Sequence, residues 1–455
     1  ASGQVTPSLS IGNLNQFATT AQLIHCLVAQ GFPVVSSQVN TITSDPQLTT
    51  RDGYAYTLSA GSPAIDAGRN DRLTSNLNTD LIGNPRIGDG TVALGAYEFQ
   101  SACLVNIPDA QFKNYLLGIN AINTNGDGEI DCQEASQFSG SLLADNRGIA
   151  SLAGLDAFTQ IVGLSVNGNQ LTTVDLSQNT RLQSLYLTNN DLSSIDLSPC
   201  PELRMVQVSG NQLANLDLSQ NTKITDLWIN SNPIATLDLQ GLPDLVYFDA
   251  SSSNLSGLDL RSNPRLVSLL ITDTPLGAID LRQNAQLETL RIDGNQLTAI
   301  DLSQNSQLIE LSAVGNQLGT VDLAANSRLR ELYLSNNPLL ELDLRANPDL
   351  EHLRFSNTTL RSVDLRNGNN QKIAGPDFFA INIPSLDCIS VDDVDYATNN
   401  WTQKDAQITY DQDCQASPCV VNIPDVNFKN ALLANSSINP NGDGELDCEE
   451  ASPPI

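Results

Sequence analysis

Apolar and polar residues alternate in a fixed 21-residue cycle through the middle of the chain. The pattern L-x-x-L-x-L-x-x-N-x-L-x-x-L-D-L-x-x-N-x-x repeats from about Leu143 to Asn370. A period of this length without slippage predicts a solenoid, in which each coil buries its leucines against neighbouring coils. Within each coil, apolar pairs such as Leu164 and Val166 flank an outward residue, which predicts a short strand with one buried face. We therefore expect a parallel sheet along one side of the solenoid.

Polar residues recur at two places in the same cycle and form two ladders. Amide side chains can satisfy backbone groups where a chain turns sharply inside a solenoid. Cys200 falls in the second ladder, so we expect a buried free thiol rather than a nucleophile. The first ladder comprises Asn169, Asn190, Asn211, Asn232, Asn295, Asn316 and Asn337, with Ser253, Thr274 and Thr358 in the other coils. The second comprises Asn179, Cys200, Asn221, Leu242, Asn263, Asn284, Asn305, Asn326, Asn347 and Gly368.

An aspartate also recurs every 21 residues. Stacked coils would bring neighbouring carboxylates close together, with a repulsion on the order of 1 to 3 kcal/mol per pair. We expect backbone N–H groups and the residues two positions on, many of them serine or arginine, to offset this repulsion. A row of bound cations is the alternative. The ladder comprises Asp175, Asp196, Asp217, Asp238, Asp259, Asp280, Asp301, Asp322, Asp343 and Asp364.

Residues 103–134 recur as residues 419–450, with an offset of 316 at every aligned position. Each copy places oxygen-bearing residues at positions 1, 3, 5, 7, 9 and 12 of a loop that resembles an EF-hand, with Gly128 or Gly444 at position 6. Such oxygens converge on a hard cation, so we expect one Ca²⁺ in each copy. Asparagine rather than aspartate at position 1 lowers the negative charge, and a turn without metal is the alternative. The expected ligands are Asn123, Asn125, Asp127, Glu129, Asp131 and Glu134, and then Asn439, Asn441, Asp443, Glu445, Asp447 and Glu450.

Cysteine spacing predicts three disulfides. The two copies of the duplicated segment each hold a cysteine pair separated by 28 residues, and a further pair flanks the segment after the last coil. Such pairing favours an extracellular location, and no C-x-x-C motif supports zinc. Cys26 has no evident partner. The expected pairs are Cys103 with Cys132, Cys388 with Cys414, and Cys419 with Cys448.

Composition limits the function. The chain has 51 acidic and 22 basic residues and a formal charge of -29, which disfavours nucleic acid and anionic membranes as partners. Neither a stretch of 18 apolar residues nor a leader pattern is present, so we expect no membrane insertion. His25 and His352 lie far apart in sequence, and the chain has no G-x-S-x-G, P-loop or H-E-x-x-H motif, so we do not expect an enzyme. The second copy, beginning at residue 419, suggests one module of a longer protein.

The 21-residue pattern resembles the short leucine-rich repeats of bacterial internalin-like surface proteins. The segment from Ser44 to Phe99 resembles the last coils and cap of right-handed parallel β-helix domains in secreted Bacteroidetes proteins. Together with the EF-hand-like segments, the chain resembles large flavobacterial surface proteins that are exported by type IX secretion and serve largely as adhesins or appendage proteins. This resemblance implies an extracellular or outer cell-surface location. The sorting domain of such proteins is absent from this sequence.

These patterns predict a mainly β fold built from solenoids. Residues 1–100 would be the end of a parallel β-helix with its cap, and 101–140 a helical EF-hand-like calcium segment. The leucine-rich solenoid would cover 141–370, followed by a disulfide-linked C-terminal cap at 371–416. Residues 417–455 would be a second EF-hand-like segment that starts the next module.

Aromatic and arginine residues stand at outward positions of the predicted strands. Both residue types are favoured anchors in protein interfaces, and aromatic rings also stack on sugars; the alternative is that these positions tolerate any residue. We predict an adhesin module that binds a protein or glycan on a target surface. The alternatives are a subunit of an extracellular appendage that packs against identical copies and, less favoured, a non-catalytic part of a polysaccharide-degrading enzyme. The candidate partner-binding residues are Tyr186, Trp228, Tyr247, Arg291, Tyr333 and Arg354.

Overall fold

The computed structural model describes residues 103–414, together with 48–51, 54–58, 423, 425–435 and 438. The chain divides into two compact units. One comprises Ala1–Leu104 and Asp131–Gln133, and the other comprises Val105–Ile130 and Glu134–Ile455.

In the first unit, β1 (Leu48–Arg51) pairs antiparallel with β2 (Tyr54–Leu58). Several expected features lie outside the described residues. They are the rest of the β-helix, the second set of expected calcium ligands, the Cys419–Cys448 pair and Cys26.

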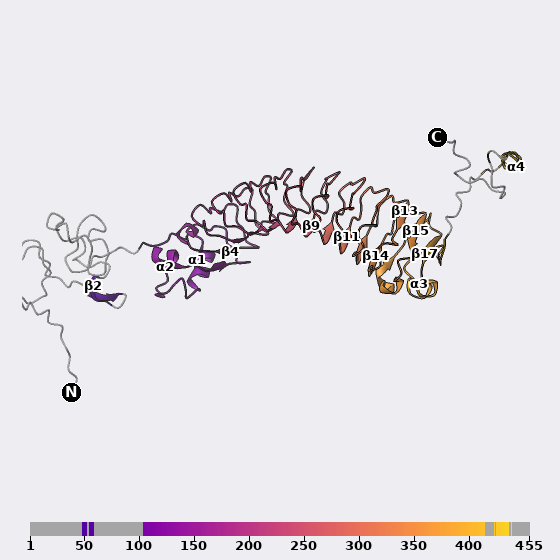
Figure 1. Cartoon of the computed structure of the whole chain (residues 1–455). Helices are drawn as coiled ribbons and strands as arrows, with labels where there is room; N and C mark the ends of the chain where they lie inside the picture. Colours follow the sequence, from indigo (N-terminus) through magenta and orange to yellow (C-terminus); the bar gives the residue numbers. More distant parts are fainter. Residues whose placement is uncertain are drawn as a thin grey trace, which may run out of the picture. The chain divides into compact units, whose positions relative to one another are not determined.

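A parallel sheet of twelve short strands follows the inner side of the curved solenoid in the second unit (Figure 1). Successive strands pair in register, so that Leu185 lies opposite Val206. The middle residue of each repeat strand is buried, as with Leu185, and its two neighbours face outward. The strands are β3 (Ser141–Leu143), β4 (Gly163–Ser165), β5 (Ser184–Tyr186), β6 (Met205–Gln207), β7 (Asp226–Trp228), β8 (Tyr247–Asp249), β9 (Ser268–Leu270), β10 (Thr289–Arg291), β11 (Glu310–Ser312), β12 (Glu331–Tyr333), β14 (His352–Arg354) and β16 (Phe378–Phe379).

The first asparagine ladder bonds to the backbone of two coils at once. Asn190 Nδ2 donates to the carbonyls of Val166 and Leu187, and its Oδ1 accepts from the Leu171 amide. The residue before each ladder position has a left-handed backbone, as at Asn189, where φ is 54°. Small or polar residues that tolerate this conformation occupy that position, a signal that the sequence analysis missed.

The second ladder is buried up to Asn347, and its amides donate to backbone carbonyls. The prediction of Gly368 as its last member was wrong, since Gly368 is exposed and the buried Asn367 bonds to the Asn347 carbonyl instead. Asn221 Nδ2 bonds to the carbonyls of Leu197 and Cys200. Cys200 is a buried free thiol, as expected, and its Sγ lies 3.5 Å from the carbonyl oxygen of Asn179. Burial raises the pKa of Cys200 to about 11, which makes this thiol a poor nucleophile.

The ten aspartates of the third ladder all accept a hydrogen bond from the amide two residues on. Where that residue is arginine, the guanidinium binds the same carboxylate, as Arg261 does with Asp259. Hydrogen bonds from Arg282 likewise lower the pKa of Asp280 to about 2. The ladder is therefore a hydrogen-bonded spine, as the sequence predicted.

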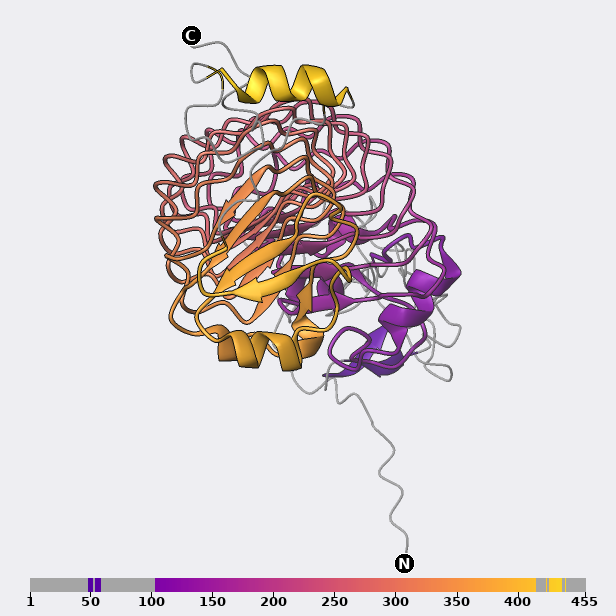
Figure 2. The same cartoon turned by 90° about the vertical axis from the view of Figure 1, so that its right-hand side faces the viewer.

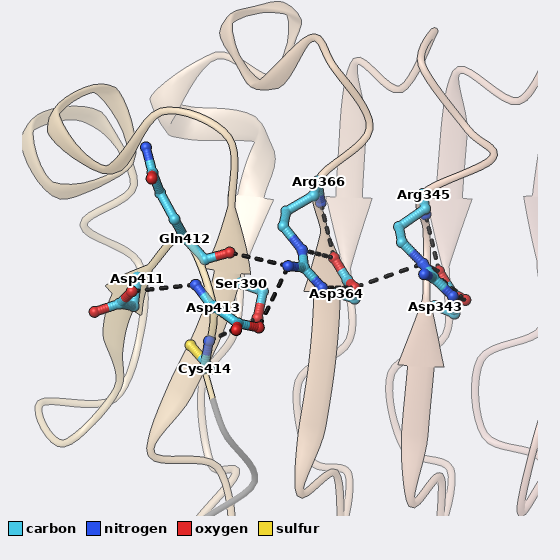
Figure 3. Close-up of polar contacts among 9 residues, drawn as sticks. All are labelled: Asp343, Arg345, Asp364, Arg366, Ser390, Asp411, Gln412, Asp413 and Cys414. Carbon is cyan, nitrogen blue, oxygen red and sulfur yellow. Dashed lines mark hydrogen bonds and ion pairs between the residues drawn. The ribbon is translucent and has the colours of Figure 1, made fainter.

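Near the C-terminal end of the solenoid, the segments that carry the ladder aspartates Asp343 and Asp364 join a second parallel sheet. Figure 3 shows the spine crossing this sheet, where Arg345 lies 3.5 Å from Asp364 and Arg366 binds Asp364 and reaches Asp413. Asp411 accepts from the Asp413 amide and so repeats the motif inside the cap. The strands, in order across the sheet, are β13 (Glu341–Asp343), β15 (Ser362–Leu365), β17 (Cys388–Val391) and β18 (Thr409–Asp411).

The cap covers this end of the solenoid (Figure 2). It contains a small aromatic core. Trp401 is fully buried and stacks on Phe378 with 4.5 Å between ring centroids, and its Nε1 donates to the Ile373 carbonyl. Cys388 and Cys414 form the disulfide expected from their spacing. The cap also contains the 3₁₀ helices η4 (Asn370–Lys372) and η5 (Gly375–Asp377), and α3 (Val394–Asn400).

Within the second unit, α1 (Ala110–Leu117) packs on the first coils. Its Phe112 and Leu116 are fully buried. Asp109 caps α1 through the Gln111 and Phe112 amides, and its other oxygen accepts from the amides of Ala150 and Ser151. The remaining described helices are α2 (Cys132–Gln137), the 3₁₀ helix η3 (Leu155–Ala157) and α4 (Val426–Leu433), and no helix in the described ranges is long and apolar enough to cross a membrane.

Candidate partner-binding face and calcium loop

The six candidate partner-binding residues all lie at outward positions of the twelve-stranded sheet. Tyr247 is the first residue of β8, and the other five are the third residues of their strands. Because the strands pair in register, these side chains belong to one continuous surface, which we call the concave face: the first and third residues of β5 to β14 in this sheet.

Outward residues of adjacent strands pack against each other. The rings of Trp228 and Tyr247 lie 4.6 Å apart at an angle of 33°. Tyr186 donates from its hydroxyl to Met205 Sδ at 3.5 Å. These rings are half-buried rather than fully exposed, so they have a packing role that the sequence analysis did not anticipate. Each contact still leaves part of a ring open to a partner.

Charged residues dominate the C-terminal part of the concave face. Arg291 pairs with Glu310 on the next strand. The Arg354 guanidinium lies over the rings of Phe379, at 4.6 Å, and Tyr333, at 5.6 Å. Burial and the hydrogen bond to Glu331 raise the pKa of Tyr333 to about 12.

Phe379 was missed at the sequence level. It belongs to the cap strand β16 and lies outside the 21-residue cycle that identified the other outward positions.

The loop of residues 123–134, where the sequence predicts a calcium site, has a backbone held by its own side chains. Asn123 accepts from the Gly126 amide, Asn125 from the Asp127 amide, and Asp127 from the Glu129 amide. Gly128 has a φ of 86°, a left-handed conformation that glycine adopts without strain. The loop therefore makes the turn that position 6 of such a site needs.

Glu134, at position 12, is only 7% exposed. Its Oε1 accepts from the amide and hydroxyl of Thr124 and from the Asn125 amide, which places the carboxylate over the start of the loop. Lys113 pairs with Glu129, whose expected contribution is its backbone carbonyl.

In the described part of the chain, no three histidine, cysteine or acidic side chains converge as a metal cluster. The loop instead combines amide, carbonyl and carboxylate oxygens, a donor set that suits a hard cation. In the first unit, Asp131 bridges to Leu104, and Cys103 forms the expected disulfide with Cys132.

Comparisons with known proteins identify the repeat. The model of the leucine-rich repeat domain of endo-β-N-acetylglucosaminidase EndoS matches residues 129–232. No curated protein matches this chain. An internalin (inlF) from Listeria monocytogenes is 20% identical with a TM-score of 0.51, over 69% of this chain and 99% of that one. The functional domain of InlJ from the same organism, which includes a cysteine ladder, is 24% identical with a TM-score of 0.49, over 67% and 74% of the two chains.

The described fold is therefore a leucine-rich repeat β-solenoid of about 13 turns with disulfides and internalin-like structural neighbours. This fold is typical of protein-binding surface modules.

Proposed function

We propose that this chain is a binding module of a secreted or cell-surface adhesin, and that the concave face holds a partner protein. The observation that carries the proposal is the set of half-exposed aromatic rings and exposed arginines that share one face of the sheet. The nine strands of the concave face, at about 4.8 Å spacing, give it a length of roughly 40 Å, which is enough for a protein interface. Buried aromatic and arginine anchors carry most of the binding energy in such interfaces.

Two disulfides among the described residues support an extracellular location. The same proposal includes export by type IX secretion, a β-helix before residue 100 and a role without catalysis. These three parts rest on the sequence.

Truncating two rings of the concave face should abolish most of the binding. We expect Trp228→Ala with Tyr186→Ala to weaken attachment at least tenfold, or about 1.4 kcal/mol, because both rings lose their contact area. The measurement is binding to a panel of immobilised extracellular matrix proteins and polysaccharides, with folding checked by circular dichroism.

Leu340→Ala is the matched control, since Leu340 is a 48% exposed apolar residue outside the concave face. Sedimentation of the same variants tests the appendage alternative, in which the two substitutions would reduce self-association instead. Unchanged attachment and unchanged assembly would contradict a role for this face.

We also propose that the loop of residues 123–134 binds Ca²⁺, and that the loop of residues 439–450 does the same. In the first loop the ion would be held by side-chain oxygens of Asn123, Asn125, Asp127, Asp131 and Glu134 and by the carbonyl of Glu129. The turn at Gly128 and the placement of Glu134 support this assignment. A bound cation would neutralise carboxylates at the start of the solenoid, and we infer that it stiffens the joint between modules.

Calcium should raise the melting temperature of the native chain. Binding to the folded state at 100 times the dissociation constant stabilises it by about 2.7 kcal/mol. Calorimetric titration should give two sites for the native chain, one each for Glu134→Gln and Glu450→Gln, and none for the double variant. Equal melting curves and equal hydrodynamic radii in calcium and in chelator would refute the proposal.

A further inference from the structure

We propose that Asp226, Trp228, Tyr247 and Asp249 form a site for an arginine or lysine side chain of the partner protein. We call these four residues the anchor site. The proposal rests on the concave face being the binding surface, and it adds the chemistry of the partner: a protein that presents a basic residue to the middle of the sheet.

Two adjacent strands build the anchor site. Strand β7 carries Asp226 and Trp228 at its outward positions, and β8 carries Tyr247 and Asp249. In the register of the sheet, Asp226 lies opposite Tyr247 and Trp228 lies opposite Asp249. The two rings therefore occupy one diagonal of a square and meet at 4.6 Å, while the two carboxylates occupy the other diagonal.

In the part of the chain that the structure describes, the carboxylates of the anchor site lack a basic partner. Asp226 accepts from the Thr225 hydroxyl at 2.6 Å, and Asp249 accepts from the Ser251 amide at 3.0 Å. Neither forms an ion pair with a lysine or arginine within the described residues. The other acidic residues at outward positions of this sheet are engaged, since Glu310 pairs with Arg291 and Glu331 accepts from the Tyr333 hydroxyl.

The same sheet contains an aromatic pair that already holds a guanidinium. Arg354 lies over the rings of Tyr333 and Phe379. In register, the residue opposite Tyr333 is Arg354, whereas the residue opposite Trp228 is Asp249. The C-terminal part of the face thus supplies its own cation, and the anchor site offers rings and carboxylates to a cation from outside.

A basic side chain fits this arrangement better than a neutral ligand. A guanidinium stacks on an aromatic face while its N–H groups reach carboxylates at the ring edge, and a lysine ammonium can make the same two kinds of contact. A neutral sugar would cover the rings but leave both carboxylates without a counter-charge. The formal charge of -29 also draws basic surfaces toward the chain. Strands β7 and β8 lie near the middle of the sheet order, where interface anchors are best shielded from water.

The test uses the full chain and a short peptide of alternating glycine and arginine, with a citrulline peptide of equal length as the neutral probe. The chain has two tryptophans, and Trp401 is fully buried in the cap, so a change in emission on titration reports on Trp228. We expect the arginine peptide to bind at least tenfold more tightly than the citrulline peptide. The double variant Asp226→Asn with Asp249→Asn should lose at least tenfold in affinity for the arginine peptide.

The matched control is Asp156→Asn with Asp191→Asn, which changes the net charge equally at exposed positions outside the sheet. Equal affinity of the native chain and the anchor-site variant would overturn the proposal, as would an equal loss in the control, which would indicate general charge attraction.

These experiments distinguish a failure of the anchor-site proposal from a failure of the proposed function. If the Trp228→Ala, Tyr186→Ala variant loses attachment to a matrix protein and the asparagine double variant keeps it, the concave face is the interface and the basic anchor is wrong.

Discussion

Replacing Trp401 with alanine is expected to lower the free energy of unfolding by about 3 to 5 kcal/mol. The indole is fully buried, stacks on Phe378 and packs edge-on against Tyr410. Removing it leaves a cavity in the cap and takes one of two side-chain donors from the Ile373 carbonyl, which keeps the Tyr396 hydroxyl. Because the cap covers the last coils, we expect the loss to appear as a lower midpoint in urea unfolding followed by circular dichroism.

Two further variants show how much of this loss of stability comes from the ring contact and how much from the hydrogen bond. Trp401→Phe keeps a ring against Phe378 but loses the hydrogen bond to Ile373, so its effect should be smaller. Leu340→Ala removes an exposed apolar side chain outside the cap and should change stability by less than about 0.5 kcal/mol. A Trp401→Ala protein as stable as the Leu340→Ala protein would mean that the aromatic core contributes little to the cap.

The second large effect is expected at the first asparagine ladder. Asn211 donates to the carbonyls of Leu187 and Val208 and accepts from the Leu192 amide, inside the solenoid. Leucine at this position would leave three backbone groups without this partner, at about 1 to 3 kcal/mol each. We therefore expect Asn211→Leu to destabilise the protein by roughly 3 kcal/mol or more in urea unfolding.

The chain itself supplies the controls for this prediction. Thr274 occupies the equivalent ladder position, where its hydroxyl donates to the Thr272 carbonyl at 3.1 Å, so Asn211→Thr should be milder than Asn211→Leu. In the second ladder, Asn221 Oδ1 has no hydrogen-bond partner among the described residues, and Leu242 stands naturally at the equivalent position of the next coil. Asn221→Leu should therefore also be milder, and equal losses at the two ladders would contradict the assignment.

Partner binding and fold stability are expected to depend on different residues of the solenoid. The ladders and the aspartate spine hold the coils together through bonds to the backbone. The carboxylates of the anchor site lie on the outer surface of the sheet and make no bond to a neighbouring coil among the described contacts. Substitutions at Asp226 or Asp249 should consequently change affinity without unfolding the solenoid. Circular dichroism would reveal a loss of fold. A variant that keeps the native spectrum but loses attachment has therefore lost a binding contact.

The sequence by itself determined the repeating part of the fold. A residue and its counterpart 21 positions on must stack when the period does not slip, so the burial of Leu185, the bonds of Asn211 and the amide contact of Asp217 all followed from the period. The same reasoning placed the rings of the concave face on one sheet. Cysteine spacing also gave the two described disulfides.

Only the tertiary structure decided the contacts that do not follow the period. Trp228 meets Tyr247 across a diagonal, 19 rather than 21 residues on, because outward side chains of adjacent strands lean toward each other. Arg354 meets Phe379, which the cap contributes from outside the cycle. The second sheet forms only near the C-terminal end, where the cap strands supply it with partners. The 21-residue period determines which positions lie one above another in the solenoid. The packing of individual side chains determines which outward carboxylates pair with an arginine of the same sheet.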